Sequence, residues 1–205
     1  MRSILIKYLS NNRIITDVVL ILLCALIFLL PSLYKINLHD FSIDQLIVGI
    51  DDWNRYARHA IDINENGLLI SNDSGNYLIP AGFLYNYFIA LCFELFGENP
   101  AFVYCMQSAL LGTTIALSYF IFRDFLKPKT GWLFLIALIV LGYLDIYLNY
   151  SFRLLSENLA IFTIMLFFLF LKKMIFFNTN RLQVLTGTLL GISQLTRPNI
   201  ILFSS

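Results

Sequence analysis

The chain has 205 residues, of which 59% are hydrophobic and only 13% are charged, and its formal net charge is +1. Soluble domains carry about 25% charged residues, so this composition excludes a soluble globular domain, whose surface needs more charge. The near-neutral balance also excludes a nucleic-acid partner, which would call for a basic face.

Apolar segments of spanning length recur along the chain. A membrane-spanning helix needs about 20 mostly apolar residues, because about 30 Å of hydrocarbon is crossed at about 1.5 Å per residue. The pattern predicts an all-α fold, a polytopic transmembrane helix bundle with an outer-face loop that carries juxtamembrane helices. The predicted spans cover approximately residues 14–34, 101–122, 132–150, 158–171 and 182–203, and the outer loop covers approximately 36–100.

Basic residues predict the orientation of these spans. Short cytoplasmic loops collect Lys and Arg, so we expect a cytoplasmic N-terminus and two cytoplasmic linkers. The residues that support this are Arg2, Lys7 and Arg13 before the first span, Arg123, Lys127 and Lys129 in one linker, and Lys172, Lys173 and Arg181 in the other. The first span is too long for a signal peptide and lacks a cleavage site, so we interpret it as a retained anchor. These features predict a multi-pass protein of the cell (inner) membrane, in contact with membrane lipids.

Two apolar segments, 80–96 and 101–122, precede the first basic linker. Because the chain must return to the cytoplasm by Arg123, only one of them crosses. The segment 80–96 is shorter and contains Asn86 and Glu94, so we predict that it lies in the outer interface. The alternative, in which both segments cross and Arg123 lies outside, stays open because charge asymmetry is a loose rule.

The outer loop contains an amphipathic pattern. Apolar residues recur there at spacings of three and four, which indicates one face of a helix. These residues are Trp53, Tyr56, Ala57, Ala60 and Ile61. We predict a helix over 52–66 that lies along the membrane surface and ends at Asn66-Gly67. Asp51 and Asp52 stand at its start, where N-capping is the alternative to a catalytic role.

Two further acids lie near the outer ends of spans. Glu157 precedes the span 158–171, where capping by Ser156 or Glu157 is the simpler interpretation. Asp145 lies inside the third span, at a depth where acids are costly and often functional unless they reach water. Outer-face acids on separate loops can serve one cleft, in which a carboxylate takes a proton from a hydroxyl. A proton relay in a transporter remains the alternative.

The cysteines and histidines predict no metal site and no cofactor. Cys24, Cys92 and Cys105 lie in apolar stretches without paired spacing, so we expect small buried hydrophobic residues. His39 and His59 are expected to be solvated loop residues rather than metal ligands.

Several short motifs occur in order along the chain. They are Asp52-Trp53-Asn54-Arg55-Tyr56-Ala57, with Gly67 after it; Pro80 leading to Leu95-Phe96-Gly97; Ser151-Phe152-Arg153 with Ser156-Glu157; and Gly187, Gly191 and Leu195-Thr196-Arg197-Pro198. Their order and spacing resemble the GT-C superfamily of polytopic glycosyltransferases, which take sugars from polyprenyl-phosphate carriers. The protein O-mannosyltransferases and the lipid A aminoarabinose transferases are the most similar members. The resemblance covers nearly the whole chain, from Arg13 to Asn199.

The resemblance implies roles for individual residues. Asp52 would be the general base, with Asp51 as a rival one position away, and Glu157 would be the second outer-loop acid. Arg197 would bind the lipid-linked phosphate, because a guanidinium offers several donors to its oxygens. Further substrate-binding candidates are Tyr56, Arg55 and Arg153. The implied reaction is a single inverting displacement from a polyprenyl-phosphate sugar to a hydroxyl of a lipid, glycan or protein, without a cofactor.

Three alternatives follow from the same pattern. Members of this superfamily run to several hundred residues with more spans, so we expect residues 1–205 to be a fragment, the N-terminal part of a GT-C-like transmembrane domain. A transporter or flippase of lipid-linked sugars would use the same carrier, but it needs polar residues through the membrane depth. A non-catalytic membrane scaffold is the third possibility.

Overall fold

The computed structural model describes residues 11–37, 52–67, 82–147, 156–177 and 179–197. All regular secondary structure within these ranges is helical, which confirms the predicted all-α fold for this part of the chain. The helices are α2 (Asn11–Asn37), α4 (Asp52–Asn66), α5 (Phe83–Phe96), α6 (Pro100–Phe122), α7 (Pro128–Tyr147), α8 (Glu157–Phe177) and α9 (Asn180–Thr196).

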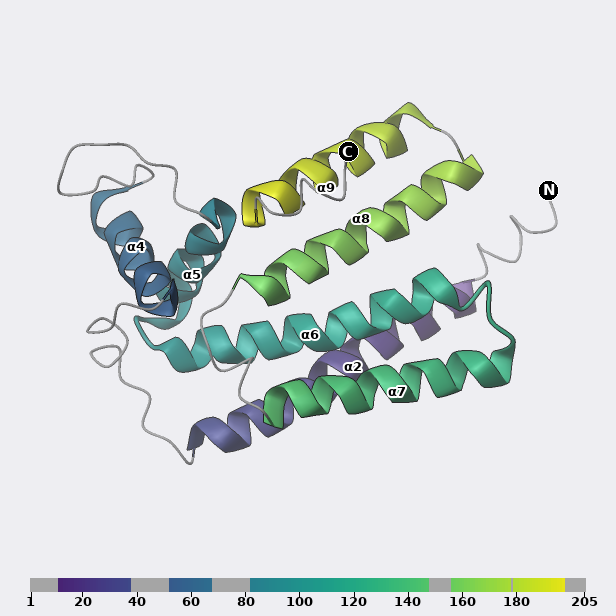
Figure 1. The fold of residues 1–205 in the computed structure, drawn as a ribbon, viewed down its shortest axis with the longest axis horizontal. Coiled ribbons are helices and arrows are strands. Elements are labelled where there is room, and N and C mark those ends of the chain that lie inside the picture. The colour runs from purple at the N-terminus through teal and green to yellow at the C-terminus, as the bar shows by residue number, and fades with distance from the viewer. Residues whose placement is uncertain (1–10, 38–51, 68–81, 148–155, 178, 198–205) are drawn as a thin grey trace.

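The long helices form a bundle around α6. Helix α6 packs against α2, α7 and α8, and α9 packs against α8, while α4 and α5 pair with each other. Figure 1 shows α2, α6, α7, α8 and α9 aligned along the long axis, with α4 and α5 gathered at one end. We call this end the α4–α5 end; α6 and α8 begin there and α9 finishes there. Helix α5 stays at this end and does not run the length of the bundle.

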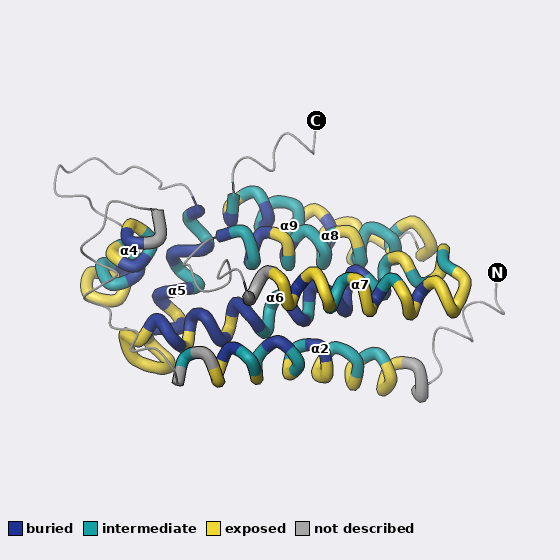
Figure 2. The backbone as a smooth tube through the Cα atoms, turned by 60° about the horizontal axis from the view of Figure 1, so that its bottom comes forward, coloured by how far each residue is buried: buried dark blue, intermediate teal, exposed yellow. Residues whose placement is uncertain are grey.

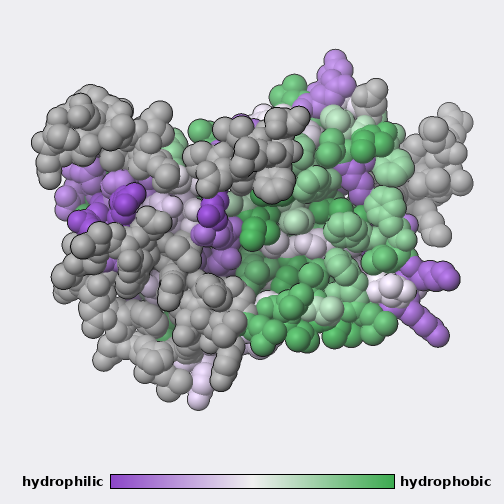
Figure 3. Space-filling model, in the orientation of Figure 1, coloured by the Kyte–Doolittle hydropathy of each residue, from purple (hydrophilic) through white to green (hydrophobic). Residues whose placement is uncertain are grey.

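Three described helices are long and apolar enough to cross a membrane: Ile14–Tyr34 within α2, Pro100–Phe122 and Glu157–Phe177. The helices Phe83–Phe96 and Pro128–Leu144 are apolar but shorter. Large hydrophobic side chains are exposed along α2 and α7, and Figure 3 shows hydrophobic residues over the flank of the bundle, with hydrophilic residues beyond it at either end. Lipid-facing helices present such a surface. The crossing of α7 and α9 stays a prediction.

Helices α2 and α6 approach each other most closely at Gly112. A Cβ atom at this position would overlap the backbone carbonyl of Cys24, so only glycine permits the contact. The same two helices are also joined where the Ser32 hydroxyl donates to the Ser108 hydroxyl oxygen at 2.6 Å, one turn before Gly112 on α6. Figure 2 shows the result: α6 is largely buried, whereas α2 keeps an exposed outer side.

A network of charged residues joins α2, α6 and α8 at the end of the bundle opposite to the α4–α5 end. The Arg123 guanidinium donates two hydrogen bonds to the Asp17 carboxylate, at 2.5 and 2.9 Å. The Lys172 ammonium pairs with Asp124 at 2.9 Å and donates to two carbonyl oxygens in the last turn of α6. Asp17 and Asp124 therefore each have a basic partner from a different segment of the chain.

The basic residues of the predicted linkers lie partly inside helices. Lys172 and Lys173 belong to α8, which continues to Phe177, whereas the predicted span ends at about residue 171. Lys129 belongs to α7, which begins at Pro128. Long basic side chains keep their ammonium groups near polar partners while their stems stay in an apolar helix, so a charge does not mark the end of the helix.

Local capping explains where α4 and α6 begin or end. Helix α4 covers Asp52–Asn66 as predicted, and Gly67 follows it with φ 90°, donating from its N–H to the Ile63 carbonyl at 2.9 Å. The predicted C-cap is therefore confirmed. At the start of α6, the Asn99 side chain accepts a hydrogen bond from the Ala101 N–H at 2.9 Å.

Candidate functional site

Glu157 and Arg197 form an ion pair at the α4–α5 end. Glu157 lies in the first turn of α8 and Arg197 directly follows α9, so the antiparallel packing of these helices brings the two residues together. The Glu157 Oε1 atom lies 2.6 Å from the Arg197 guanidinium, and the side chains are 41% and 40% exposed. Two residues that were predicted to belong to the site, from separate segments of the chain, are thus neighbours. Both are accessible to solvent and to a ligand.

The remaining predicted site residues divide into two groups: those whose side chains the structure describes, Tyr56 and Arg55, and those whose side chains it does not describe. Asp52 is the first residue of α4 and therefore lies at the α4–α5 end, although its side chain is outside the described part of the structure. Asp51 and Arg153 lie outside the described residues altogether, and so does the side chain of Asp145. The roles predicted for these four residues stay predictions.

Tyr56 connects α4 to the start of α5. Its ring meets that of Tyr85 edge-on, with centroids 5.0 Å apart. It also lies against Gly82, where a Cβ atom would come within 3.0 Å of the ring and where φ is 75°. Both the backbone conformation and this close approach therefore favour glycine at position 82. Arg55, the neighbouring substrate-binding candidate, is exposed on α4.

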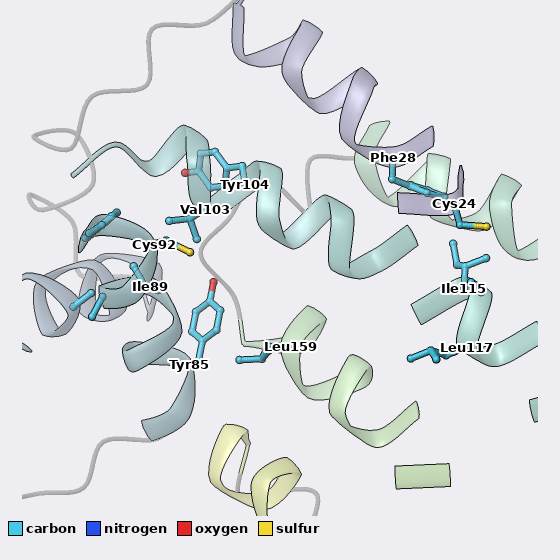
Figure 4. Close-up of a cluster of buried hydrophobic side chains, with 14 of the residues drawn as sticks. Cys24, Phe28, Tyr85, Ile89, Cys92, Val103, Tyr104, Ile115, Leu117 and Leu159 are labelled. Atoms are coloured by element: carbon cyan, nitrogen blue, oxygen red, sulfur yellow. The ribbon is translucent and has the colours of Figure 1, made fainter. Parts of the chain in front are cut away.

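Tyr85 is fully buried and ties α5 to α6. Its hydroxyl donates a hydrogen bond to the Gln107 Oε1 atom at 2.7 Å. Figure 4 shows Tyr85 reaching from α5 toward α6, with Leu159 of α8 beside it. The sequence did not single out either Tyr85 or Gln107, because nothing local pairs two residues on different helices.

Tyr85 lies in the same region of the molecule as the ion pair, because α5 packs against α9, which Arg197 follows. Burial raises the pKa of Tyr85 well above its usual value. Tyr85 is therefore a neutral hydrogen-bond donor.

Two asparagines in this region are buried without a partner. Asn54 and Asn86 are both 0% exposed, and neither the amide nitrogen nor the amide oxygen of either side chain has a hydrogen bond. No individual role was predicted for Asn54, and Asn86 was only a reason to predict that its segment does not cross the membrane. A usable signal was present, since Asn54 stands at a spacing of three from Ala57, on the buried side of an amphipathic helix.

His59 differs from the sequence prediction. It lies half-buried on α4 rather than in a solvated loop. Burial lowers its pKa, with a smaller contribution from the positive charge of Arg55. His59 is therefore neutral at physiological pH. The three cysteines are buried and free, as predicted.

The described residues bring together an acid, a guanidinium, a buried tyrosine and two orphaned amides at one end of an apolar bundle. Of these groups the guanidinium is accessible, and it can bind an anion. Comparisons of the chain with protein-family models, with curated proteins and with solved structures found no match.

Proposed function

We propose that this chain is a membrane glycosyltransferase, or the part of one that carries its site, which transfers a sugar from a polyprenyl-phosphate carrier to an acceptor hydroxyl with inversion. The observation that carries the proposal is the ion pair between Glu157 and Arg197 at the end of the bundle where α4 begins with Asp52. Glu157 and Arg197 come from separate segments of the chain, and α4 lies at the same end of the bundle. A transfer site at a membrane surface would need the three residues to converge.

The proposed chemistry is a single displacement. The Asp52 carboxylate accepts the proton of the acceptor hydroxyl, whose oxygen attacks the anomeric carbon of the sugar. The bond between that carbon and the phosphate oxygen breaks, and polyprenyl phosphate leaves with the electron pair. Arg197 stabilises the charge of the leaving phosphate, because a guanidinium binds phosphate oxygens bidentately. Glu157 holds the guanidinium in place before the phosphate arrives.

The proposal places the α4–α5 end on the outer face of the cell (inner) membrane and the N-terminus in the cytoplasm. Arg123 and Lys172 lie at the opposite end of the bundle. Their position supports this orientation, because basic residues collect on the cytoplasmic side.

Cysteine labelling tests the orientation. Cysteines introduced at Asn72 and Ser151 are expected to react with a membrane-impermeant maleimide in intact cells, whereas one at Lys129 should react only after permeabilisation. The unmodified chain is the control, because its own cysteines are buried and burial raises the pKa of Cys92 to about 11. Labelling of Lys129→Cys in intact cells would reverse the assignment.

Substitution of Arg197 tests the site. With labelled polyprenyl-phosphate sugar and membranes containing the full-length protein, Arg197→Gln is expected to raise the apparent KM for the lipid donor about tenfold or more. Charge-assisted phosphate contacts have that strength. Abundance should change little, because half-exposed ion pairs contribute only about 0–1 kcal/mol to stability.

The matched control is the exchange Glu157→Arg with Arg197→Glu. It restores an ion pair but puts the cation on α8. If the pair has only a structural role, the double variant should regain wild-type transfer. If Arg197 binds phosphate, it should stay impaired. Absence of transfer by the wild-type protein contradicts the proposed function and favours a transporter or a scaffold.

A further inference from the structure

The end of the bundle opposite to the α4–α5 end carries an excess of positive charge, and we call it the basic end. The two acids described there are already paired, Asp17 with Arg123 and Asp124 with Lys172. Four further basic residues are exposed at this end, and no acid in the described part of the chain forms an ion pair with them: Lys127, Lys129, Lys173 and Arg181. The protein itself therefore leaves four positive charges without a counter-charge.

Two helices that begin at the basic end add to this excess. Helices α7 and α9 have no acid in their first turns, where Lys129 and Arg181 lie instead. A helix N-terminus carries a partial positive charge, so an anion is stabilising there and a cation is not. Positive side chains at two such termini therefore favour an anion that comes from outside the protein.

Large apolar side chains are exposed beside these charges. Phe125 is 74% exposed and stands two residues before Lys127, and Trp132 is 54% exposed and stands three residues after Lys129. Phe176 is likewise exposed, three residues after Lys173 on α8. A phosphate in free solution makes no use of neighbouring apolar surface. A phospholipid does, because its charged headgroup lies directly above apolar chains, at the level where aromatic residues collect.

The link between α6 and α7 is held in place by its neighbours. The Lys172 ammonium of α8 lies 5.4 Å from the centroid of the Phe125 ring, and the Trp132 ring lies 5.8 Å from that of Tyr119 on α6. The Gly131 N–H donates a hydrogen bond to the Lys127 carbonyl at 2.8 Å. The lysines of this link therefore stay at the basic end, where hydrophilic residues lie beyond the hydrophobic flank (Figure 3).

We propose that the basic end binds the headgroups of anionic phospholipids in preference to zwitterionic ones. The exposed lysines and Arg181 contact the phosphates, while the acyl chains lie beside Phe125, Trp132 and Phe176. A zwitterionic headgroup carries its own cation, which the four positive charges repel, so the preference follows from charge. The inference goes beyond sugar transfer and needs only that the bundle crosses a membrane.

The positions of the two tryptophans allow a direct test. Trp53 belongs to α4 and Trp132 to α7, so they lie at opposite ends of the bundle. In the Trp53→Phe variant of the full chain, reconstituted into vesicles, only Trp132 fluoresces, and lipids with brominated acyl chains quench it on contact. Vesicles are mixtures of phosphatidylglycerol and phosphatidylcholine in which one or the other is brominated. In low salt we expect Trp132 to report a preference of about three- to tenfold for phosphatidylglycerol, as one or two exposed ion pairs provide.

Charge variants of the Trp53→Phe chain identify the residues responsible. Lys127→Gln with Lys129→Gln should remove most of the preference, whereas Lys127→Arg with Lys129→Arg should keep it. The matched control is Arg55→Gln with Arg58→Gln, which removes the same charge from α4 and should leave the preference unchanged. About 0.5 M NaCl should weaken the preference of the unsubstituted lysines, because salt screens exposed charges.

Equal quenching by the two lipids in low salt overturns the inference, and so does a preference that survives Lys127→Gln with Lys129→Gln. An equal preference at Trp53, measured in Trp132→Phe, would also overturn it, because the attraction would then not belong to the basic end. Loss of the preference on adding glycerol 3-phosphate, but not NaCl of equal ionic strength, would assign the site to soluble phosphates instead. Lipid preference without sugar transfer contradicts the proposed function alone, whereas transfer without lipid preference contradicts this inference alone.

Discussion

Asp52→Asn is expected to lower the rate of sugar transfer by roughly 10²–10⁴-fold, the usual contribution of a positioned general base. Asp52 is the first residue of α4, and asparagine caps a helix about as well as aspartate. The substitution therefore removes a proton acceptor while the helix keeps its start. Initial rates with labelled polyprenyl-phosphate sugar, normalised to the amount of protein in the membrane, measure the effect.

Asp51→Asn is the matched control for this experiment. A larger loss with Asp51→Asn than with Asp52→Asn would move the assignment by one residue. If Asp52 is only a cap, Asp52→Asn should leave both abundance and transfer unchanged. Wild-type transfer by the variant that carries both substitutions would rule out the proposed mechanism.

Gly112→Leu is expected to lower the free energy of unfolding by about 3 kcal/mol, at the upper end of the range for overpacking. Even a Cβ atom at Gly112 would overlap backbone atoms of Cys24 and Ala25, and a backbone cannot rotate away as a side chain does. Helices α2 and α6 must therefore separate. Thermal unfolding in detergent, followed by circular dichroism, measures the loss.

Gly187→Leu is the control for Gly112→Leu. It makes the same substitution within a helix, but a Cβ atom at Gly187 meets nothing within 4 Å. Leucine is also a better helix former than glycine, so this variant should be as stable as the wild type or more stable. Equal stability of the two variants would contradict the close contact of α2 with α6.

Helix α4 shows what can be predicted from local sequence. Its apolar spacing, the acid at its start and Gly67 after its end all lie within about four turns, and the structure has the helix at Asp52–Asn66. Helix α5 lies at one end of the bundle and does not run its length. Its short length and its polar residues are consistent with this position.

Contacts between distant segments could not be predicted in this way. Tyr85 and Gln107 are 22 residues apart, and the contact at Gly112 depends on where a different helix crosses it. Periodicity identifies the face that a helix buries but not the partner that covers it. The same limit explains why α8 continues beyond the predicted span 158–171, since the Lys172 ammonium group has acceptors on α6.

The candidate site divides along the same line. The resemblance of short motifs selected Glu157 and Arg197, and their side chains meet. It did not assign a role to Asn54 or Asn86, because an unsatisfied amide is visible only when the surrounding helices are in place.

The ion pair of Asp17 with Arg123 has a consequence for how the protein is made. The two residues are 106 positions apart, so if α2 crosses the membrane as predicted, it reaches the membrane before the partner of Asp17 has been synthesised. In that interval the acid must stay at the water interface, since an unpaired carboxylate enters hydrocarbon at high cost. We expect α2 to be inserted at a shallow depth at first and to reach its final depth only when α6 is inserted. The final positioning of the first helix would then be a late step of biogenesis.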